Sequence, residues 1–543
     1  MERLKQLLTR ALFQHPPRLL VGFRKIVVDG ARSADCTVAF VWDATRTIRR
    51  LRTVAAIGVY LLGSFLLLYP VLRTPVVADD LINPFTQSVD GGSTLRSGLA
   101  YSWHGSTEGA SFRVVGGAVG AVYDWLWLTV SATFDVGMST FYAATKFVVL
   151  LACASVIAQF WFLVAKKYGR AIRFRDALVL VSVALFGTLQ IHGLWSNDPV
   201  VSYPLAGYGA AALGFALLSM AVVASGQTAW RPYVTGSAVA VVAVSYYEIN
   251  IGAVIGSAAI LLMGSWTQRA HRRDFVASLL KGALFVGAPA VVVLYGRTVT
   301  AANSAVYAGT QARAAGSLRA LVLGLGGLLP ASAWRLSSRT LGGGWFRFSS
   351  LLIVVFVIAC LARWWSLRPV EDELGTRSVR SGPRVVAIAA VAGYGLFGVA
   401  LQSITVKVQD ETRQLGYVYT AYAMGSCVVA LGIAILARFL LLRWRSNSTQ
   451  YLVCAAALVF LVVQSTVNWR LSERMNVNYA LNRSVLDAFD QDASVKERCE
   501  AFSAWSEVPW PDYYRNDMRD GLQKAYEYYF GQPFCPAFPE VVR

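Results

Sequence analysis

Two adjacent carboxylates, Asp79 and Asp80, are the residues of this sequence best placed to accept a proton. They follow an apolar run over residues 54–72. Like charges this close raise one another's pKa, which suits a general base that works near neutral pH. A sugar-transfer enzyme needs such a carboxylate to deprotonate an acceptor hydroxyl. The alternative is a solvated loop in which an aspartate caps the helix that follows.

Two further polar groups occur where apolar runs end. In Tyr246-Tyr247-Glu248 an ionisable residue lies at membrane depth, which is costly and marks a candidate functional site. We expect Glu248 to hydrogen-bond sugar hydroxyls and one of the two tyrosines to stack on the sugar ring. The alternative is a turn between short spans, with Glu248 in water or paired with an arginine. His192 and Asp198 could line a polar cavity or simply cap a helix.

The elements that must position these side chains are membrane helices. Of 543 residues, 56% are hydrophobic and only 15% are charged, and the mean hydropathy is +0.49. A soluble domain carries about 25% charge, and a bilayer span needs about 20 apolar residues. The sequence therefore predicts an all-α polytopic membrane protein with about eleven transmembrane helices. We expect these helices over residues 54–72, 140–165, 176–194, 205–225, 233–249, 251–266, 276–296, 350–367, 385–405, 418–442 and 451–468.

Two parts of this prediction need comment. The runs 233–249 and 251–266 are short and could form one broken segment. Residues 118–135 are apolar and aromatic but contain Asp124, so we expect an interfacial helix on the outer face there. Both features depend on where the chain enters and leaves the bilayer.

The charge distribution indicates the topology. Lys and Arg number 50 against 31 Asp and Glu, and the basic residues gather in alternate loops, as in cytoplasmic loops that face anionic lipid. This pattern argues against a nucleic-acid partner. Residues 1–52 form a basic amphipathic cytoplasmic segment, and 53–468 form the transmembrane domain. The loops 73–139 and 297–349 are outside, as is a small helical C-terminal region, 469–543.

Positive charge outside the membrane is unusual and needs a reason. Arg297 follows the predicted span 276–296, and Lys407 and Arg413 lie on either side of an acidic pair before the next span. A cation at this level could bind a lipid phosphate and stabilise the charge that develops on it as a leaving group. The alternative is pairing with local carboxylates or with lipid headgroups.

Neither the cysteines nor the histidines indicate a resident metal. The seven cysteines include no CxxC motif and no Cys/His ligand spacing. Cys499 and Cys535 could form a disulfide if the C-terminal region is outside the cytoplasm. A divalent cation would find hard ligands only in Asp79, Asp80 and Asp198. The sequence therefore predicts no particular cofactor and leaves open a divalent cation at these carboxylates.

The basic segment before the first span and Asp79-Asp80 in the first outside loop resemble the GT-C glycosyltransferase superfamily. The long first loop and the outside C-terminal region are similar to that superfamily too. The resemblance implies a multi-span enzyme that uses a polyprenyl-phosphate sugar donor, with Asp79 or Asp80 as base and inversion at the anomeric carbon. The acceptor would be a cell-envelope glycan or lipid. The Ala-, Val- and Arg-rich composition is typical of a GC-rich bacterium. We therefore expect the protein to lie in a bacterial plasma membrane.

A transporter or flippase for a lipid-linked glycan is the alternative function. It would also need many spans, cationic phosphate contacts and a membrane-embedded acid such as Glu248. It would not need a carboxylate pair in the first outside loop, and it usually shows internal repeats, which this sequence does not display. The sequence also lacks the GxSxG, P-loop and HExxH motifs of hydrolases, ATPases and zinc proteases.

Overall fold

The computed structural model describes residues 34–77, 79–86, 94–107, 112–168, 172–192, 198, 200–266, 272–302, 311–334, 381–411, 421–443, 447–536 and 538. Over these residues the secondary structure is helical, apart from an isolated antiparallel bridge between Ala312 and Thr405. Nine of the described helical segments are long and apolar enough to cross a membrane, so the chain is a multi-pass membrane protein.

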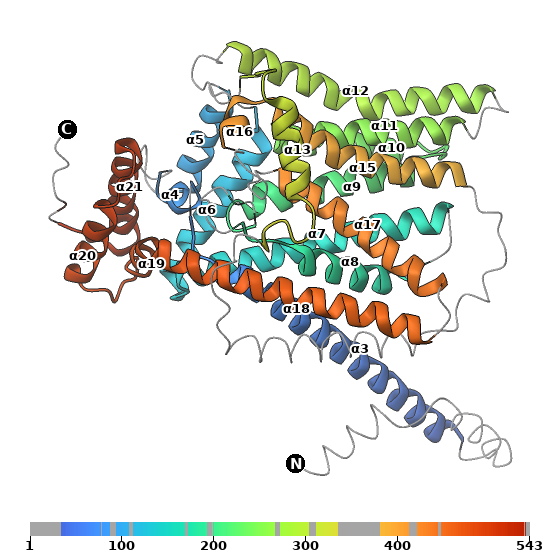
Figure 1. Cartoon of the computed structure of the whole chain (residues 1–543), viewed down its shortest axis with the longest axis horizontal. Coiled ribbons are helices and arrows are strands. Elements are labelled where there is room, and N and C mark those ends of the chain that lie inside the picture. Colours follow the sequence, from blue (N-terminus) through green and yellow to red (C-terminus); the bar gives the residue numbers. More distant parts are fainter. Residues whose placement is uncertain are drawn as a thin grey trace. The chain divides into compact units, whose positions relative to one another are not determined.

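The candidate spans use most of the long helices shown in Figure 1. They lie in α3 (Ala34–Leu72), α6 (Val114–Phe134), α7 (Met138–Tyr168), η1 (Leu205–Gly209) with α9 (Ala210–Ala224), η2 (Glu248–Asn250) with α11 (Ile251–Trp266), α12 (Arg272–Ala302), α15 (Ser381–Ser403), α17 (Ala421–Arg443) and α18 (Asn447–Asn478). The remaining helices are α4 (Asp79–Thr86), α5 (Leu95–Thr107), α8 (Phe174–Thr188), α10 (Arg231–Tyr246), α13 (Ser317–Gly327), α16 (Val406–Glu411), α19 (Ala480–Asp487), α20 (Val495–Ser506) and α21 (Asp512–Phe530).

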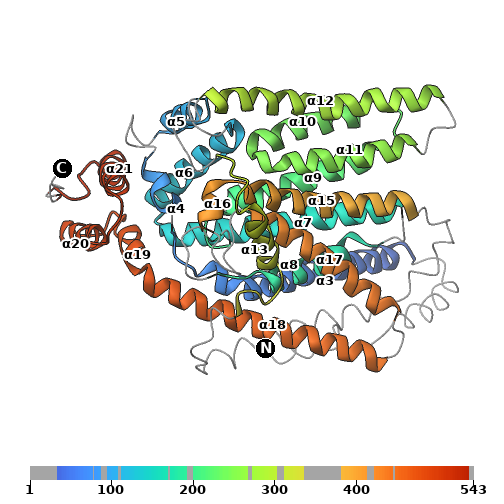
Figure 2. The same cartoon turned by 45° about the horizontal axis from the view of Figure 1, so that its top comes forward.

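Most of the predicted spans correspond to these helices, and four predictions need a separate statement. The run 233–249 is α10, which has 16 residues and is joined to α11 by the short turn η2, so two helices form there. The predicted span 350–367 lies outside the described residues. Residues 118–135 form α6, which is long and apolar enough to span, and its Asp124 is buried. Figures 1 and 2 show α6 beside α4 and α5 at one end of the bundle.

The predicted span 176–194 is wrong at its second end, because α8 stops at Thr188. The chain that follows is non-helical, and side-chain amides from α18 satisfy its backbone. The Leu189 carbonyl accepts from Gln464 at 2.9 Å and from Asn468 at 2.7 Å. The Ile191 N–H donates to Asn468 Oδ1 at 3.0 Å. Non-helical backbone at membrane depth is tolerated only where the protein supplies such partners.

The chain divides into two compact units, Met1–Leu62 and Gly63–Arg543. In the second unit, the long helices pack around a continuous apolar core, and glycines allow close helix contacts. A Cβ at Gly236 of α10 would lie 1.9 Å from the ring of Phe285 in α12. Small residues at such crossings let membrane helices approach closely, since lipid supplies little hydrophobic drive for association.

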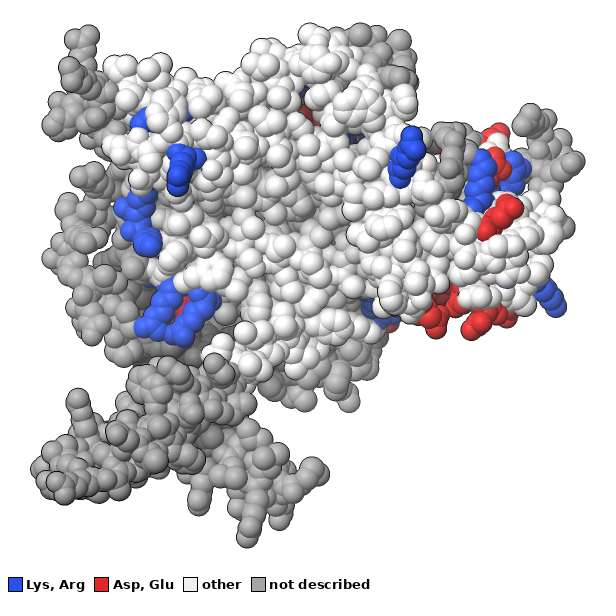
Figure 3. Space-filling model, turned by 180° about the vertical axis from the view of Figure 1, so that it is seen from behind, with Lys and Arg blue, Asp and Glu red and all other residues white. Residues whose placement is uncertain are grey.

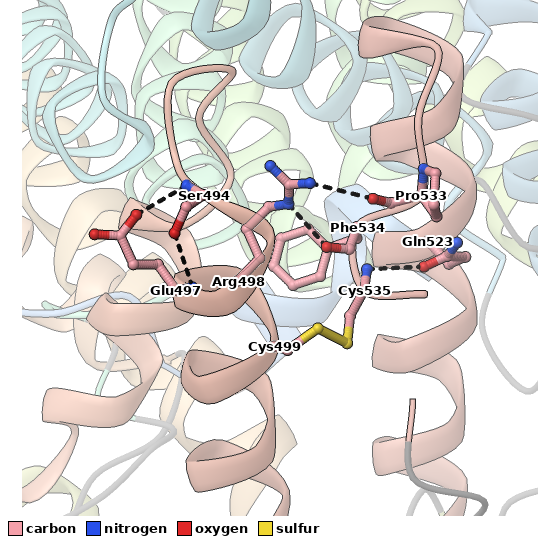
Figure 4. Close-up of a disulfide and its surroundings, with 8 residues drawn as sticks. All are labelled: Ser494, Glu497, Arg498, Cys499, Gln523, Pro533, Phe534 and Cys535. Carbon is pink, nitrogen blue, oxygen red and sulfur yellow. Dashed lines mark hydrogen bonds between the residues drawn. A yellow bond between two sulfur atoms is a disulfide. The ribbon is translucent and has the colours of Figure 1, made fainter. Parts of the chain in front are cut away.

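The C-terminal helices α19, α20 and α21 have a core of their own, which is continuous with α4, α6 and the start of α7. Cys499 and Cys535 form a disulfide with a Cα–Cα distance of 5.1 Å. Figure 4 shows Arg498 beside this disulfide, directed at the carbonyls of Pro533 and Phe534. Arg498 is 1% exposed and donates to the Phe534 carbonyl at 2.8 Å. The disulfide and this arginine therefore hold residues 533–535 against α20.

Charge is distributed unevenly over the molecule. Figure 3 shows mainly Lys and Arg at the end of the bundle away from α19 to α21, whereas acidic and basic residues are mixed on those C-terminal helices. The basic end includes Lys166 and Lys167 in the last turn of α7 and Arg231 at the start of α10. Such asymmetry is the pattern that orients membrane proteins.

Candidate functional site

The carboxylate pair begins α4, a short amphipathic helix at the end of the bundle where α5 and α6 also lie (Figure 2). Leu81, Ile82 and Phe85 are buried and anchor this helix in the core shared with the C-terminal helices. Asp79 is exposed and Asp80 is partly buried. The helix therefore presents its first turn, and both carboxylates, to the surroundings of the bundle end.

Two tyrosines hold the carboxylates. The Tyr203 N–H donates to Asp80 Oδ2 at 2.6 Å, and the Tyr142 hydroxyl donates to the same oxygen. The Tyr203 hydroxyl donates to Asp79 Oδ2 at 3.0 Å. Among the described residues, Asp80 Oδ1 makes no hydrogen bond. Both hydrogen bonds to Asp80 thus fall on one of its oxygens, Oδ2.

Tyr203 makes both contacts from an unusual backbone conformation. Its φ of 56° lies in the left-handed region, which costs a residue with a side chain about 1–3 kcal/mol. Pro204 and the π-helical turn η1 follow it directly. Strained residues and π turns recur at functional sites. Here the conformation directs the amide of Tyr203 to Asp80 and its phenol to Asp79.

The environment of Asp80 sets its protonation near neutrality. Burial raises the pKa of Asp80 to about 6 from an ordinary 3.8. Hydrogen bonds from Tyr142 and Tyr203 favour the ionised form and offset part of this rise. The negative charge of Asp79 raises this pKa further, and the positive charge of Lys146 lowers it. A carboxylate with a pKa near 6 is ionised at pH 7 and still basic enough to accept a proton.

Lys146 is a buried cation that the sequence analysis did not single out. It lies in α7, is 1% exposed, and its ammonium is 4.6 Å from the centre of the Tyr142 ring. It donates to Thr74 Oγ1 at 2.7 Å and to the Val71 carbonyl at 3.2 Å, and so ties α7 to the end of α3. A lysine inside the apolar run 140–165 was the available signal.

Lys407 of α16 lies in the same part of the molecule but is ion-paired. Its ammonium is 4.0 Å from Glu411. Burial raises the pKa of Glu411, Lys407 opposes this rise, and the charges of Asp410 and Asp79 add to it, so α16 lies close to the carboxylate pair. Arg413, the other predicted phosphate ligand of this segment, lies outside the described residues.

Glu248 is paired with an arginine, as in the alternative interpretation of its sequence. Arg113 Nε is 2.7 Å from Glu248 Oε2 and its Nη2 is 3.1 Å from Oε1, a two-pronged contact. The same guanidinium lies over the Tyr247 ring, 4.1 Å from its centre. Arg297, exposed at the end of α12, lies close enough for its charge to act on Glu248. Nothing in the sequence around Arg113 indicates this partner.

Tyr246 makes a structural contact, and its ring is not exposed for stacking on a sugar. It is 7% exposed, and its hydroxyl donates to the Leu205 carbonyl at 2.6 Å. Leu205 begins η1, two residues after Tyr203. Tyr246 therefore connects the Glu248 turn to the turn that holds the carboxylate pair.

His192 and Asp198 are both buried, at 3% and 1% exposure. Asp198 accepts the backbone N–H groups of His192 at 2.5 Å and Val200 at 2.9 Å. The imidazole Nδ1 is 3.7 Å from the Asp198 carboxylate. Asp198 thus organises the turn that leads to Tyr203, and neither residue faces water in the way the helix-cap interpretation expects.

Over the part of the chain that the structure describes, no three His, Cys, Asp or Glu side chains gather closely enough to hold a metal ion. Asp79 and Asp80 are adjacent, but tyrosine donors occupy one oxygen of each.

No family model matches the sequence, and no curated protein matches it significantly. The function must therefore be argued from the site itself.

Proposed function

We propose that the protein is a membrane glycosyltransferase that moves a sugar from a polyprenyl-phosphate donor to a hydroxyl of a cell-envelope glycan or lipid. The observation that carries this proposal is the geometry of Asp80. One oxygen is fixed by Tyr142 and Tyr203, and the other makes no hydrogen bond among the described residues. Together with a pKa of about 6, this arrangement suits a base for an acceptor hydroxyl. The resemblance to the GT-C superfamily adds the donor class.

In the proposed reaction, ionised Asp80 accepts the hydroxyl proton on Oδ1 while the hydroxyl oxygen attacks the anomeric carbon. The bond from that carbon to the phosphate oxygen breaks on the opposite face, so the configuration inverts. Polyprenyl phosphate leaves with the electron pair. Its growing negative charge needs a cation, and Lys407 on α16, a helix close to the carboxylate pair, is a described candidate.

Asp79 has a different role in this proposal. It is exposed, and its Oδ2 accepts the Tyr203 hydroxyl at 3.0 Å. Its charge raises the pKa of Asp80, which makes Asp80 the stronger base. We therefore assign proton transfer to Asp80 and electrostatic tuning to Asp79.

The topology of the proposal places α4 and the C-terminal helices outside the cytoplasm. The opposite end of the bundle carries mainly basic residues, as expected for a cytoplasmic face (Figure 3). The Cys499–Cys535 disulfide suits an oxidising compartment. The donor would then be bound from the outer leaflet of a bacterial plasma membrane.

A transporter or flippase for a lipid-linked glycan is the second candidate. The observation that favours it is the presence of charged groups in candidate spans, Lys146 in α7 and Glu248 in η2. Both make fixed local contacts, Lys146 with the end of α3 and Glu248 with Arg113. A flippase would also have no use for the Asp80 geometry.

The test is sugar transfer by the purified protein. A panel of short-chain polyprenyl-phosphate sugars is offered to wild type, Asp80→Asn and Asp79→Asn, with donor binding measured separately. We expect Asp80→Asn to lose transfer by about 10³-fold while it still binds donor, and Asp79→Asn to lose less. Undiminished transfer by Asp80→Asn would exclude Asp80 as the base. Absence of transfer by wild type, together with flipping of the lipid-linked sugar in vesicles, would favour the transporter.

A further inference from the structure

The short non-helical segment between α3 and α4 accepts hydrogen bonds from three side chains. Its backbone cannot form helix hydrogen bonds, so its carbonyls need other partners. Side chains of distant helices supply them: the Arg73 carbonyl accepts from Asn476 at 3.1 Å, Thr74 from Lys146 at 3.4 Å, and Val76 from Asn482 at 3.0 Å. Two of the three donors belong to the last part of the chain.

Asn482 of α19 connects this segment to the C-terminal helices. It is 2% exposed, and its Nδ2 donates to Val76, three residues before Asp79. Its Oδ1 accepts the indole N–H of Trp505 in α20 at 3.1 Å. Trp505 is fully buried. The Asn482 amide nitrogen thus binds the segment before the carboxylates, and the amide oxygen binds the C-terminal core.

A second, independent contact joins the C-terminal helices to α4. Gly521 of α21 lies against the last turn of α4, where an added Cβ would be 2.4 Å from the Phe85 carbonyl oxygen. Only glycine allows the two helices to approach so closely. Phe85 and Leu522 belong to the same apolar core. The C-terminal helices therefore contact both the chain that precedes the carboxylates and the helix that carries them.

We propose that the C-terminal helices α19 to α21 position the catalytic carboxylates, with Asn482 as the positioning residue that transmits their placement through Val76 to Asp79 and Asp80. That these carboxylates are catalytic rests on the proposed function. The disulfide and Arg498 keep α20 and the chain after α21 together, so that the support for Asn482 is rigid. The C-terminal region is then part of the site and not a separate module.

The physical reason is that the rate of proton transfer depends strongly on the position of the base. A shift of about 1 Å in a reacting group can cost about 100-fold in rate. Loss of the Asn482 amide leaves the buried Val76 carbonyl without its partner, and the segment relaxes until water or another donor satisfies it. That relaxation moves α4, changes the hydration of Asp80 and alters its distances to Tyr142 and Tyr203.

The test combines kinetics with a titration that does not require sugar transfer. Full-length protein in lipid nanodiscs is compared as wild type, Asn482→Leu and Trp505→Phe. Arg483→Ala is the control, because its side chain is 63% exposed and pairs with Asp487 of the same helix. Dicyclohexylcarbodiimide, which modifies protonated carboxyl groups, is applied across a pH series, and mass spectrometry measures labelling of the peptide that contains Asp80. The charged or titratable groups that act on Asp80 are Asp79, Tyr123, Tyr142, Lys146 and Tyr203.

We expect Asn482→Leu to lower kcat about tenfold with little change in the acceptor KM, and Trp505→Phe to have a smaller effect in the same direction. Labelling of Asp80 should shift to lower pH in both variants, because burial is the main cause of its raised pKa and relaxation hydrates it. The control should match wild type in both measurements. If Asn482→Leu fails to form the Cys499–Cys535 disulfide, Trp505→Phe, which removes the indole donor to Asn482 and keeps an aromatic ring in the core, decides.

The positioning role would be overturned if Trp505→Phe and a folded Asn482→Leu both kept the wild-type labelling midpoint and the wild-type kcat. A shifted midpoint in the variants, without sugar transfer by wild type from any donor, would support the positioning of Asp80 and count against the glycosyltransferase. Failure of the inference and failure of the proposed function are therefore distinguishable.

Discussion

Tyr203 donates its backbone N–H to Asp80 Oδ2 at 2.6 Å, and the residue that makes this contact has a left-handed φ of 56°. Because Tyr142 donates to the same oxygen, one side of the Asp80 carboxylate is saturated and the other is not. This asymmetry gives two carboxylates that are adjacent in sequence different environments. It also makes the pKa of Asp80 the quantity that mutations of its neighbours should change.

Tyr142→Phe should move the acid limb of the pH–rate profile to higher pH. The Tyr142 hydroxyl hydrogen-bonds the ionised form of Asp80 and so lowers its pKa. Removing it should raise that pKa above the wild-type value of about 6, so that less base is ionised at pH 6 to 7. The measurement is kcat from pH 5 to 9 in wild type and variant. A limb that stays in place, or moves to lower pH, would contradict control of Asp80 by Tyr142.

Asp80→Asn should be inactive yet more stable than wild type at pH 7. The pKa of Asp80 rises from 3.8 to about 6 on folding, so the folded state disfavours the ionised form. The stability associated with the neutral form is present below pH 4 and is lost as pH rises through about 6. Asparagine cannot ionise, and it keeps an oxygen for Tyr203.

The expected gain is about 1–2 kcal/mol, less than the roughly 3 kcal/mol of two full pKa units because Asp80 is partly solvated. Thermal unfolding in detergent at pH 4 and pH 7 measures it. The difference between variant and wild type should be small at pH 4 and larger at pH 7. An equal difference at both pH values would indicate an effect unrelated to ionisation.

Arg113 and Glu248 should act as one unit. Their two-pronged contact is partly exposed, with side-chain exposures of 39% and 32%, so a coupling of about 1 kcal/mol is expected. Arg113→Gln, Glu248→Gln and the double variant are compared for stability and for the donor KM. The double variant should resemble each single variant. Additive losses in KM would instead mean that Glu248 contacts substrate independently of Arg113.

The helices were largely predictable from sequence, because a bilayer requires long apolar segments whose backbone bonds are internal. The early end of α8 was not predictable. It depends on Gln464, which is 275 residues away from Leu189 and replaces the helix partner of that carbonyl. Apolar composition alone gave no reason to stop the helix at Thr188.

The site was predictable only in part for the same physical reason. Adjacent acids drew attention to Asp79 and Asp80, but the choice between them depends on Tyr142 and Tyr203, which are 62 and 123 residues from Asp80. The partner of Glu248 is 135 residues away. Contacts at such separations arise from helix packing, which local patterns do not encode.

Reactivity of introduced cysteines should report the topology. Gln227 is exposed at the basic end of the bundle, and Glu507 is exposed in the C-terminal region. In a background without the free cysteines, a membrane-impermeant maleimide should label Glu507→Cys in intact cells and Gln227→Cys only after permeabilisation. The reverse pattern would place Asp80 inside and remove the outer-leaflet donor from the proposal.

Removal of the Cys499–Cys535 disulfide should destabilise the C-terminal helices and weaken catalysis together. The bond closes a loop with a sequence separation of 36, for which chain entropy predicts about 2–4 kcal/mol. Because α21 packs on α4 through Gly521 and Phe85, loosening this region should also lower kcat. Cys499→Ser, Cys535→Ser and the double variant should lose similar stability, since each removes the same bond.

The measurement is thermal unfolding and kcat with and without a membrane-impermeant reductant. Reductant should affect wild type and leave the double variant unchanged. Wild-type kcat in a double variant whose C-terminal helices unfold at lower temperature would show that the disulfide stabilises the region without influencing Asp80. A parallel loss of both would link the covalent bond to the carboxylates through the same contacts that Asn482 and Gly521 provide.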